Sequence, residues 1–224
     1  MMSHPLNRET AMADHFIVMG DILKSSKYNG RELMRDFKRL VLSCNKKLAD
    51  GILSPYTVTL GDEFQGVSKS LHWSVQSLLY LEESSLRKGF PFALRYVVHY
   101  GRIDTPLNRK IAHGMVGRGL THARELLTTK HRGLPRFLFD LPNQNLATQL
   151  SQLFGVMASI TRDWKRRDAD LIFDMLSSDD NTAIAAKHGK NRSQIWKRRR
   201  NMRVDDYKAL RAIAIQLSQG EGTE

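Results

Sequence analysis

The chain has 224 residues, of which 41% are hydrophobic, a proportion typical of a globular protein with its own core. No apolar run approaches the ~20 residues that a membrane span needs, the first 13 residues lack the hydrophobic segment of a signal peptide, and the single cysteine, Cys44, excludes an intramolecular disulfide. We therefore expect a cytoplasmic protein with no membrane partner, and the net charge of +12 indicates an anionic partner such as nucleic acid or a nucleotide.

The first predicted strand spans residues 14–20 and contains four consecutive apolar residues, as is typical of a strand covered on both faces. Asp21 follows, so a carboxylate stands at the end of this strand. Ser25 and Ser26 come next, in front of a helix predicted over residues 30–49. Backbone amides near a helix start can bind a phosphate, although serine there more often caps the helix or a turn.

The second and third strands are predicted over residues 52–60 and 63–67, and Gly61-Asp62 lies between them. This pair is a two-residue hairpin signal, because glycine accepts the positive φ of a tight turn. The turn places a second carboxylate at the tip of the sheet. Two carboxylates at neighbouring strand ends, Asp21 and Asp62, are the oxygen ligands with which proteins hold Mg²⁺ or Mn²⁺ against a phosphate. The alternative is that Asp62 serves only the turn.

The remaining elements of the first part are a helix, a strand, a helix and a strand, at residues 68–87, 90–99, 119–129 and 135–140. The resulting order β-α-β-β-α-β-α-β is that of a ferredoxin-like α/β sheet with additions. A helix over residues 143–165 carries an apolar stripe that either packs on the sheet or forms a dimer surface. We place a domain boundary near residue 160, which divides the chain into domains 1–160 and 161–224.

The second domain is predicted to be small and all-α, with the spacing of a helix-turn-helix over residues 181–200. Ala185 lets two helices approach, Gly189 makes the sharp turn, and Ile195 anchors the second helix. The second helix then offers a set of polar and basic side chains to base edges and phosphates: Arg192, Ser193, Gln194, Lys197, Arg198, Arg199 and Arg200. The alternatives are a basic solvated face or a protein-interaction module.

Four short segments resemble the SatD family, bacterial proteins that pair such a sheet domain with a C-terminal helix-turn-helix. They are Gly20–Ser26, Leu60–Gly66, Leu94-Arg95 and His122-Ala123-Arg124. The resemblance covers roughly residues 14–200, and Gly-Asp-Glu-Phe-Gln-Gly is its most specific part. The first two segments also resemble the metal motifs of class III nucleotide cyclases and, more loosely, of GGDEF diguanylate cyclases.

The cyclase resemblance implies a nucleotide cyclase-type fold and a metal-nucleotide site. Asp21, Asp62 and the backbone carbonyl of Ile22 match the ligands of Mg²⁺ or Mn²⁺ on a nucleoside triphosphate. The other implied residues are Ser25, Ser26, Gly61 and Arg118 around the nucleotide and Arg124 as the catalytic residue. Thr121 stands where cyclases carry an asparagine, and Arg124 comes one residue early, so metal-nucleotide binding carries over better than cyclisation does. A solvated helix face is the alternative for both arginines.

Two functions remain open from the sequence. The first is a SatD-like regulatory protein that binds a metal-nucleotide in its N-terminal domain and duplex DNA through its C-terminal helix-turn-helix. The alternative is a nucleotidyl cyclase or related nucleotidyltransferase that makes a cyclic or oligomeric nucleotide from NTP. A homodimer is expected in either case, because class III cyclases build their site between two copies and paired helix-turn-helix units gain affinity for DNA. His99 and His113 receive no role.

Overall fold

A mixed five-stranded sheet in the order β2-β3-β1-β4-β5 forms the centre of the computed structural model, which describes residues 13–28, 30–59, 61–129 and 135–220. The strands are β1 (Ala13–Ile22), β2 (Ile52–Val58), β3 (Glu63–Ser68), β4 (Leu94–Ile103) and β5 (Phe137–Asp140). β1 pairs antiparallel with β3 and β4, and β5 adds parallel to β4. The predicted order of elements and the ferredoxin-like α/β arrangement are therefore confirmed.

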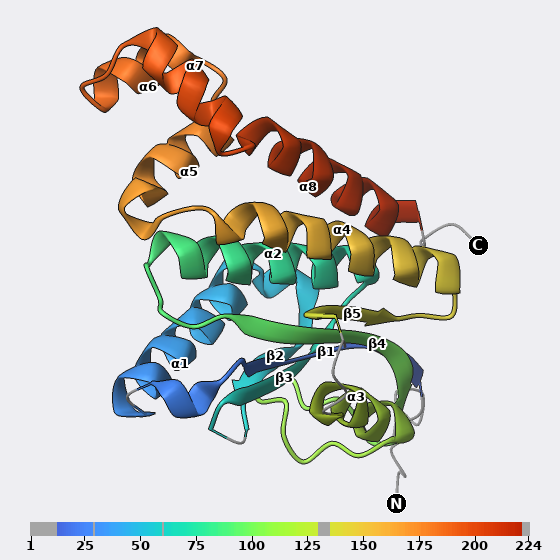
Figure 1. The fold of residues 1–224 in the computed structure, drawn as a ribbon. Coiled ribbons are helices and arrows are strands. Elements are labelled where there is room, and N and C mark those ends of the chain that lie inside the picture. The colour runs from blue at the N-terminus through green and yellow to red at the C-terminus, as the bar shows by residue number, and fades with distance from the viewer. Residues whose placement is uncertain (1–12, 29, 60, 130–134, 221–224) are drawn as a thin grey trace, which may run out of the picture.

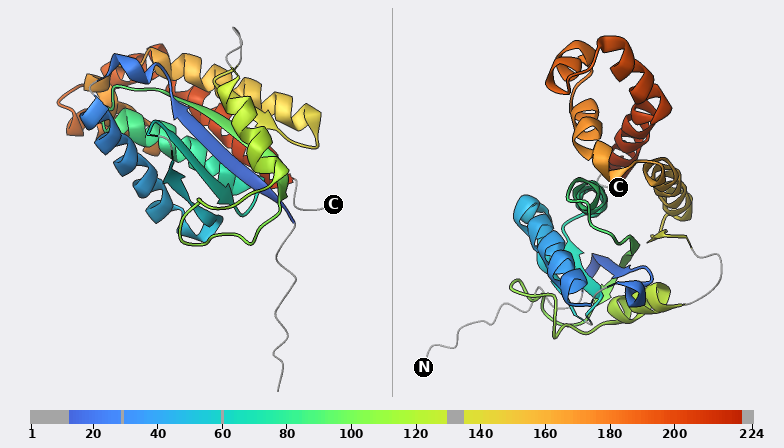
Figure 2. Two further views of the ribbon diagram at one scale, coloured as in Figure 1. Left: turned by 90° about the horizontal axis from the view of Figure 1, so that it is seen from below. Right: turned by 60° about the vertical axis from the view of Figure 1, so that its left-hand side comes forward.

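Eight α-helices accompany the sheet in the described part of the chain. They are α1 (Gly30–Lys47), α2 (Leu71–Arg87), α3 (Arg118–Thr128), α4 (Gln144–Arg162), α5 (Ala169–Ser177), α6 (Asn181–Lys187), α7 (Arg192–Asn201) and α8 (Val204–Gln219). Figure 1 shows α2 and α4 on one side of the sheet and α3 on the other, with α8 lying over α2 and α4. The second view in Figure 2 shows the same layers, and α5 to α8 lie together beyond α2.

The two faces of the sheet carry separate cores because side chains alternate along each strand. Val18 of β1 and Tyr96 of β4 belong to the larger core, which α1, α2 and α4 cover and which also buries Cys44. Ile17, which precedes Val18, and Val97, which follows Tyr96, belong to the smaller core under α3. Any polar side chain on that second face therefore lies on the α3 side of the sheet.

The strand ends differ from the sequence prediction. β1 continues past residue 20 to Ile22, because Asp21 still pairs with Glu63 on one side and Arg95 on the other. The β2–β3 turn is wider than two residues, since the Thr59 amide donates to the Glu63 carbonyl at 2.9 Å and three residues lie between them. Gly61 has the expected positive φ of 81°. Leu60, which we included in the second strand, lies outside the described residues.

The apolar stripe of α4 packs inside the molecule. Of the two predicted alternatives, internal packing is therefore confirmed, and the stripe is not an exposed dimer surface. Five apolar residues of this stripe are buried: Leu146, Leu150, Phe154, Met157 and Ile160. At the C-terminal end, α8 continues to Gln219 and Ser218 is buried. Residues 1–12 and 221–224 lie outside the described part. Among the helices described, none is both long and apolar enough to cross a membrane.

Candidate functional site

Three acidic residues meet at one corner of the sheet, where β1 ends and the β2–β3 turn begins. Asp21 lies opposite Glu63 on β3, and the Ile22 amide donates to the Asp62 carbonyl at 2.9 Å. The structure thus places the predicted metal residues Asp21 and Ile22, at the end of β1, beside Asp62 in the turn that precedes β3. We call Asp21, Asp62 and Glu63 the acidic corner.

Arg95 of β4 binds the first of these carboxylates. Its Nε donates to Asp21 Oδ1 at 3.1 Å, and its Nη2 donates to Oδ2 at 2.6 Å, so the pair is bidentate. Both side chains are about one-fifth exposed. This ion pair was not foreseen from the sequence, because the partners are 74 residues apart and meet only through the β1–β4 register.

Glu63 and Asp62 have no side-chain hydrogen bond or ion pair with any residue that the structure describes. Burial raises the pKa of the Glu63 carboxyl; nearby Arg124 opposes this shift, while the negative charges of Asp21 and Asp62 add to it. Carboxylates with unsatisfied negative charge suit a hard cation such as Mg²⁺. The donors suit a cation in charge and type, but both Asp21 oxygens are bonded to Arg95, and the three side chains do not bring ligand atoms within 4.8 Å of one another.

Arg124 of α3 points towards the same corner within its own chain. Its Nη2 donates to Gln65 Oε1 at 3.0 Å, and the Gln65 amide group donates to the Ala112 carbonyl. A cavity of about 680 Å³ lies beside these two side chains, between α3, the 113–117 loop and β3. That volume lies in the range of small-molecule sites.

The other residues assigned to the nucleotide are spread around this region. Ser25 and Ser26 form a short 3₁₀ turn before α1, and neither makes a side-chain hydrogen bond with a described residue. Gly61 is exposed in the β2–β3 turn, and Arg118 is exposed at the start of α3. Their role towards a nucleotide stays a prediction.

At the far end of the molecule, α6 and α7 are joined by a four-residue turn. Ala185 and Ile195 are buried between the helices, and Gly189 in the turn has a φ of 60°. Asn191 caps α7: its side chain accepts from the Gln194 amide at 2.9 Å, and Gln194 Oε1 accepts from the Asn191 amide at 3.0 Å. Gln194 thus has a capping role that the sequence prediction did not assign to it.

The position of Arg199 corrects one predicted DNA contact. Its side chain is 6% exposed and forms ion pairs with Asp179 at 3.2 Å and Asp205 at 2.9 Å. Its Nε also donates to Asn181. The assignment to a phosphate is wrong because four consecutive basic residues at 100° intervals surround most of a helix, so one of them faces inward. Arg198 is partly engaged as well, donating to Asp168 at 2.9 Å.

The exposed face of α7 carries the remaining basic residues and a tryptophan that the sequence prediction missed. Trp196 is 54% exposed, and the Arg200 guanidinium lies 5.6 Å from the centre of its ring. Arg192 and Lys197 are exposed on the same face and have no ion pair with a described residue. We call Arg192, Trp196, Lys197 and Arg200 the α7 face.

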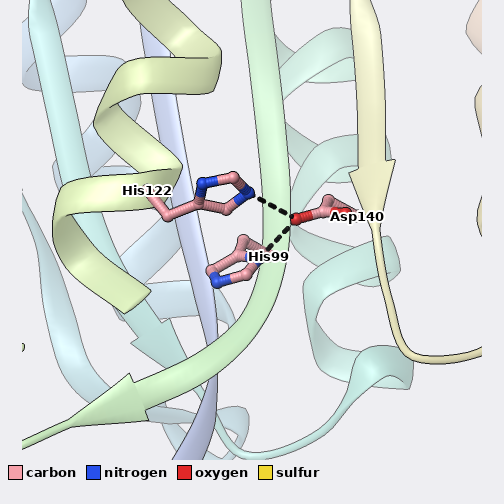
Figure 3. Close-up of side chains that lie close together, drawn as sticks. All are labelled: His99, His122 and Asp140. Carbon is pink, nitrogen blue, oxygen red and sulfur yellow. Dashed lines mark hydrogen bonds and ion pairs between the residues drawn. The ribbon is translucent and has the colours of Figure 1, made fainter. Parts of the chain in front are cut away.

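A third cluster lies on the α3 side of the sheet (Figure 3). His99 Nδ1 and His122 Nε2 both lie within hydrogen-bond distance of Asp140 Oδ2, at 2.7 and 3.1 Å. Sequence reasoning missed this cluster because the residues come from β4, α3 and β5 and show no local ligand spacing. The only available signal was His99 itself, at a strand position that alternates with buried residues.

The chain was also compared with known proteins. The sequence model of the SatD family matches residues 15–217. No curated protein matches the chain. A solved structure of a bacterial light-regulated adenylyl cyclase is 18% identical with a TM-score of 0.44, and the match covers 61% of this chain and 45% of that one. The catalytic core of a rhodopsin-guanylyl cyclase with converted specificity, in complex with ATPαS, is 13% identical with a TM-score of 0.35, covering 55% of this chain and 76% of that one.

Proposed function

The chain belongs to the SatD family, and we propose that it is a regulatory protein that binds duplex DNA through α6 and α7 and a metal-nucleotide at the acidic corner. The observation that carries the DNA-binding part is the charge on the α7 face. Arg192, Lys197 and Arg200 project from one helix surface without acidic partners among the described residues, while Asp168, Asp179 and Asp205 nearby are paired with Arg198 or Arg199.

This arrangement suits a helix that enters a DNA groove. Phosphates attract the unpaired cations, and the exposed Trp196 ring adds apolar surface for base edges or sugars. Ser193 and Gln194, at the exposed start of α7, lie where recognition helices contact bases. Arg198 is half-buried and paired, so we assign it a minor contribution, and Arg199 is no longer part of the proposed interface.

The DNA-binding proposal is tested with the full-length protein and labelled duplex DNA by fluorescence anisotropy at several salt concentrations. The triple variant Arg192→Ala/Lys197→Ala/Arg200→Ala should bind all sequences more weakly. The slope of log affinity against log salt should become shallower by about 1 for each phosphate that the variant no longer neutralises.

A matched control removes three exposed cations from α1, as Lys38→Ala/Lys46→Ala/Lys47→Ala. It has the same change in net charge and should bind DNA like the wild type. If the two triple variants lose affinity equally, binding is a consequence of overall charge, and the α7 face is not the interface.

The metal-nucleotide part of the proposal is supported by the acidic corner and by the cavity that Gln65 and Arg124 line. Asp21 and Asp62 would hold Mg²⁺ or Mn²⁺, which neutralises phosphate charge when bound. Arg124 lines the cavity and would contact the phosphates as a positively charged donor. A nucleoside triphosphate with Mn²⁺ should raise the melting temperature by mass action, and Asp62→Ala should remove that rise. An Asp62→Ala variant that responds like the wild type would contradict the site.

A second candidate function is a nucleotidyl cyclase or related nucleotidyltransferase. The contact between Arg124 and Gln65 favours it, since this places a cation beside the acidic corner in the same chain. Incubation with each NTP and Mn²⁺, followed by chromatography, separates the two candidates. A new product that Asp21→Ala abolishes supports the enzyme, and stabilisation without any product supports the regulator.

We also propose that the protein acts as a homodimer. One helix pair offers DNA a small interface, and two-fold pairing over successive major grooves is the usual way to gain affinity. Light scattering of the DNA-free protein at micromolar concentration should give about twice the monomer mass of 25.6 kDa. A particle of the monomer mass, with and without nucleotide, would contradict the dimer.

A further inference from the structure

We propose that His99, His122 and Asp140 form a binding site for a divalent transition-metal ion of the Zn²⁺ class. One ligand atom from each side chain lies within 4.8 Å of the other two. Among the residues that the structure describes, this is the one group of three or more His, Cys, Asp or Glu side chains whose ligand atoms converge in this way. Figure 3 shows both imidazole rings directed at the same carboxylate oxygen.

The backbone around the cluster leaves room for it. A Cβ atom at Gly101 would lie 2.2 Å from His99 Nε2, so only glycine permits the observed position of the ring. A Cβ atom at Gly119 would lie 2.7 Å from the Gly101 carbonyl carbon, so this second glycine lets α3 approach β4 closely. His122 follows Gly119 by three residues, about one helical turn, and is thereby brought over the sheet beside His99.

The distances are close to those of a bound ion. Zn–N and Zn–O bonds of about 2.0–2.1 Å in a tetrahedral site put the ligand atoms roughly 3.3 Å apart. The two nitrogens lie 2.7 and 3.1 Å from the Asp140 oxygen, so a small outward movement of the carboxylate admits a cation. The His122 side chain is 49% exposed and can adjust at little cost, whereas His99 is 12% exposed and fixed in the sheet.

The ligand types select the class of ion. Two imidazole nitrogens and one carboxylate oxygen suit Zn²⁺ and its first-row neighbours, whereas Mg²⁺ and Ca²⁺ prefer oxygen ligands alone. Three protein ligands leave a fourth position for water or an anion. In the absence of a metal, the same geometry is explained by two imidazole N–H groups that each donate a hydrogen bond to the Asp140 carboxylate. The experiment must therefore distinguish a metal-bound site from this hydrogen-bonded arrangement.

This site is separate from the acidic corner. His99 and Arg95 lie on the same face of β4 but four residues apart, which is about 13 Å at the rise of a β-strand. The proposed ion therefore lies outside the proposed metal-nucleotide site, and the two proposals can fail independently.

The experiment is a titration of tag-free, full-length protein with ZnCl₂ by isothermal titration calorimetry, repeated with CoCl₂ to follow visible absorption. The wild type should bind one equivalent at this site, and His122→Gln should lower the affinity at least tenfold. The matched control is His188→Gln. His188 Nε2 lies 2.6 Å from Asp174 Oδ2 in an equally close His–Asp pair that lacks a second imidazole.

The control variant should bind Zn²⁺ like the wild type, and so should Asp21→Ala, which changes the acidic corner. His122 is half-exposed on a helix, so its variant should keep the wild-type circular dichroism spectrum. Failure of the wild type to bind Zn²⁺, or equal binding by wild type and a His99→Gln/His122→Gln variant, would overturn the proposal. Either result would leave the cluster as a hydrogen-bonded triad.

Discussion

Glu63 shows how a single side chain can report on the acidic corner. Its pKa is raised in the folded chain, chiefly by burial, and Asp21 and Asp62 add to this shift. Because the folded pKa lies above the unfolded value of about 4.3, the fold loses stability as the pH rises through the interval between them. Ionised Glu63 therefore destabilises the metal-free protein at neutral pH.

The first prediction is that Glu63→Gln raises the melting temperature of the metal-free protein at pH 7. The gain should shrink when both proteins are compared below about pH 3, where the wild-type carboxyl is protonated in both states. Thermal unfolding followed by circular dichroism at the two pH values measures it. A variant that is less stable than the wild type at pH 7 would show that the Glu63 charge is favourably paired.

Arg199 and Arg200 are neighbours in the sequence with opposite environments. Arg199 is buried and ion-paired to Asp179 and Asp205, whereas Arg200 is exposed against the Trp196 ring. The sequence could show that the 197–200 run is basic and helical. It could not show which residue of the run faces inward, because that depends on acidic partners from the α5–α6 connection and α8.

We predict that Arg199→Met lowers stability by about 1–3 kcal/mol, because a buried group no longer makes its hydrogen bonds and ion pairs. The two aspartates are well exposed and remain solvated, which keeps the effect below that of a fully buried pair. Arg200→Met should change stability by less than about 0.5 kcal/mol. Urea unfolding of the two variants measures the difference, and equal destabilisation would contradict the assigned environments.

At the scale of elements, the contact of α3 with β4 depends on two glycines that face each other. A Cβ atom at Gly119 would meet backbone atoms of Gly101 and Arg102 at 2.7 to 2.9 Å, and backbone cannot move aside cheaply. By contrast, Gly155 lies on the exposed side of α4, and a Cβ atom there meets nothing within 4 Å. The two helices thus contain glycine for different reasons.

The third prediction compares Gly119→Ala with Gly155→Ala. The first should be destabilised by about 1–3 kcal/mol through overpacking, and it should also weaken Zn²⁺ binding because α3 carries His122. The second should gain about 0.5–1 kcal/mol, since alanine is the better helix former. Denaturant unfolding measures both. A Gly119→Ala variant as stable as the wild type would mean that α3 does not approach β4 this closely.

The elements themselves were largely predictable because helix and strand periodicities are local properties of the sequence. Strand ends were not: β1 runs on to Ile22 because of its partners on both sides, and the β2–β3 turn contains one residue more than expected. The acidic corner was likewise predictable in part, since Asp21 and Asp62 follow strand-like segments. Arg95 and the His99 cluster required the sheet register, which no short sequence pattern specifies.

In the whole molecule, helices from both predicted domains pack against one another. α8 packs over α2 and α4, and Glu83 of α2 accepts hydrogen bonds from Tyr207 at 3.2 Å and Arg211 at 2.9 Å. The Trp164 indole also donates to the Met202 carbonyl at 2.7 Å. Residues on both sides of position 160 contribute to the same hydrophobic core.

We therefore predict that the full-length protein unfolds in one cooperative transition. Far-UV circular dichroism, which follows all helices and strands, should give the same midpoint as tryptophan fluorescence, to which Trp164 and Trp196 contribute from the helical part. Arg199→Met, which alters only α5 to α8 and their connections, should lower this common midpoint without splitting it, because α8 cannot leave α2 and α4 without exposing their apolar surface. Two separate midpoints, with the lower one sensitive to Arg199→Met, would mean that the helical part unfolds independently.

A single transition has a functional consequence. A ligand at the acidic corner and DNA at the α7 face would then stabilise the same folding unit, and each would raise the midpoint seen by both probes.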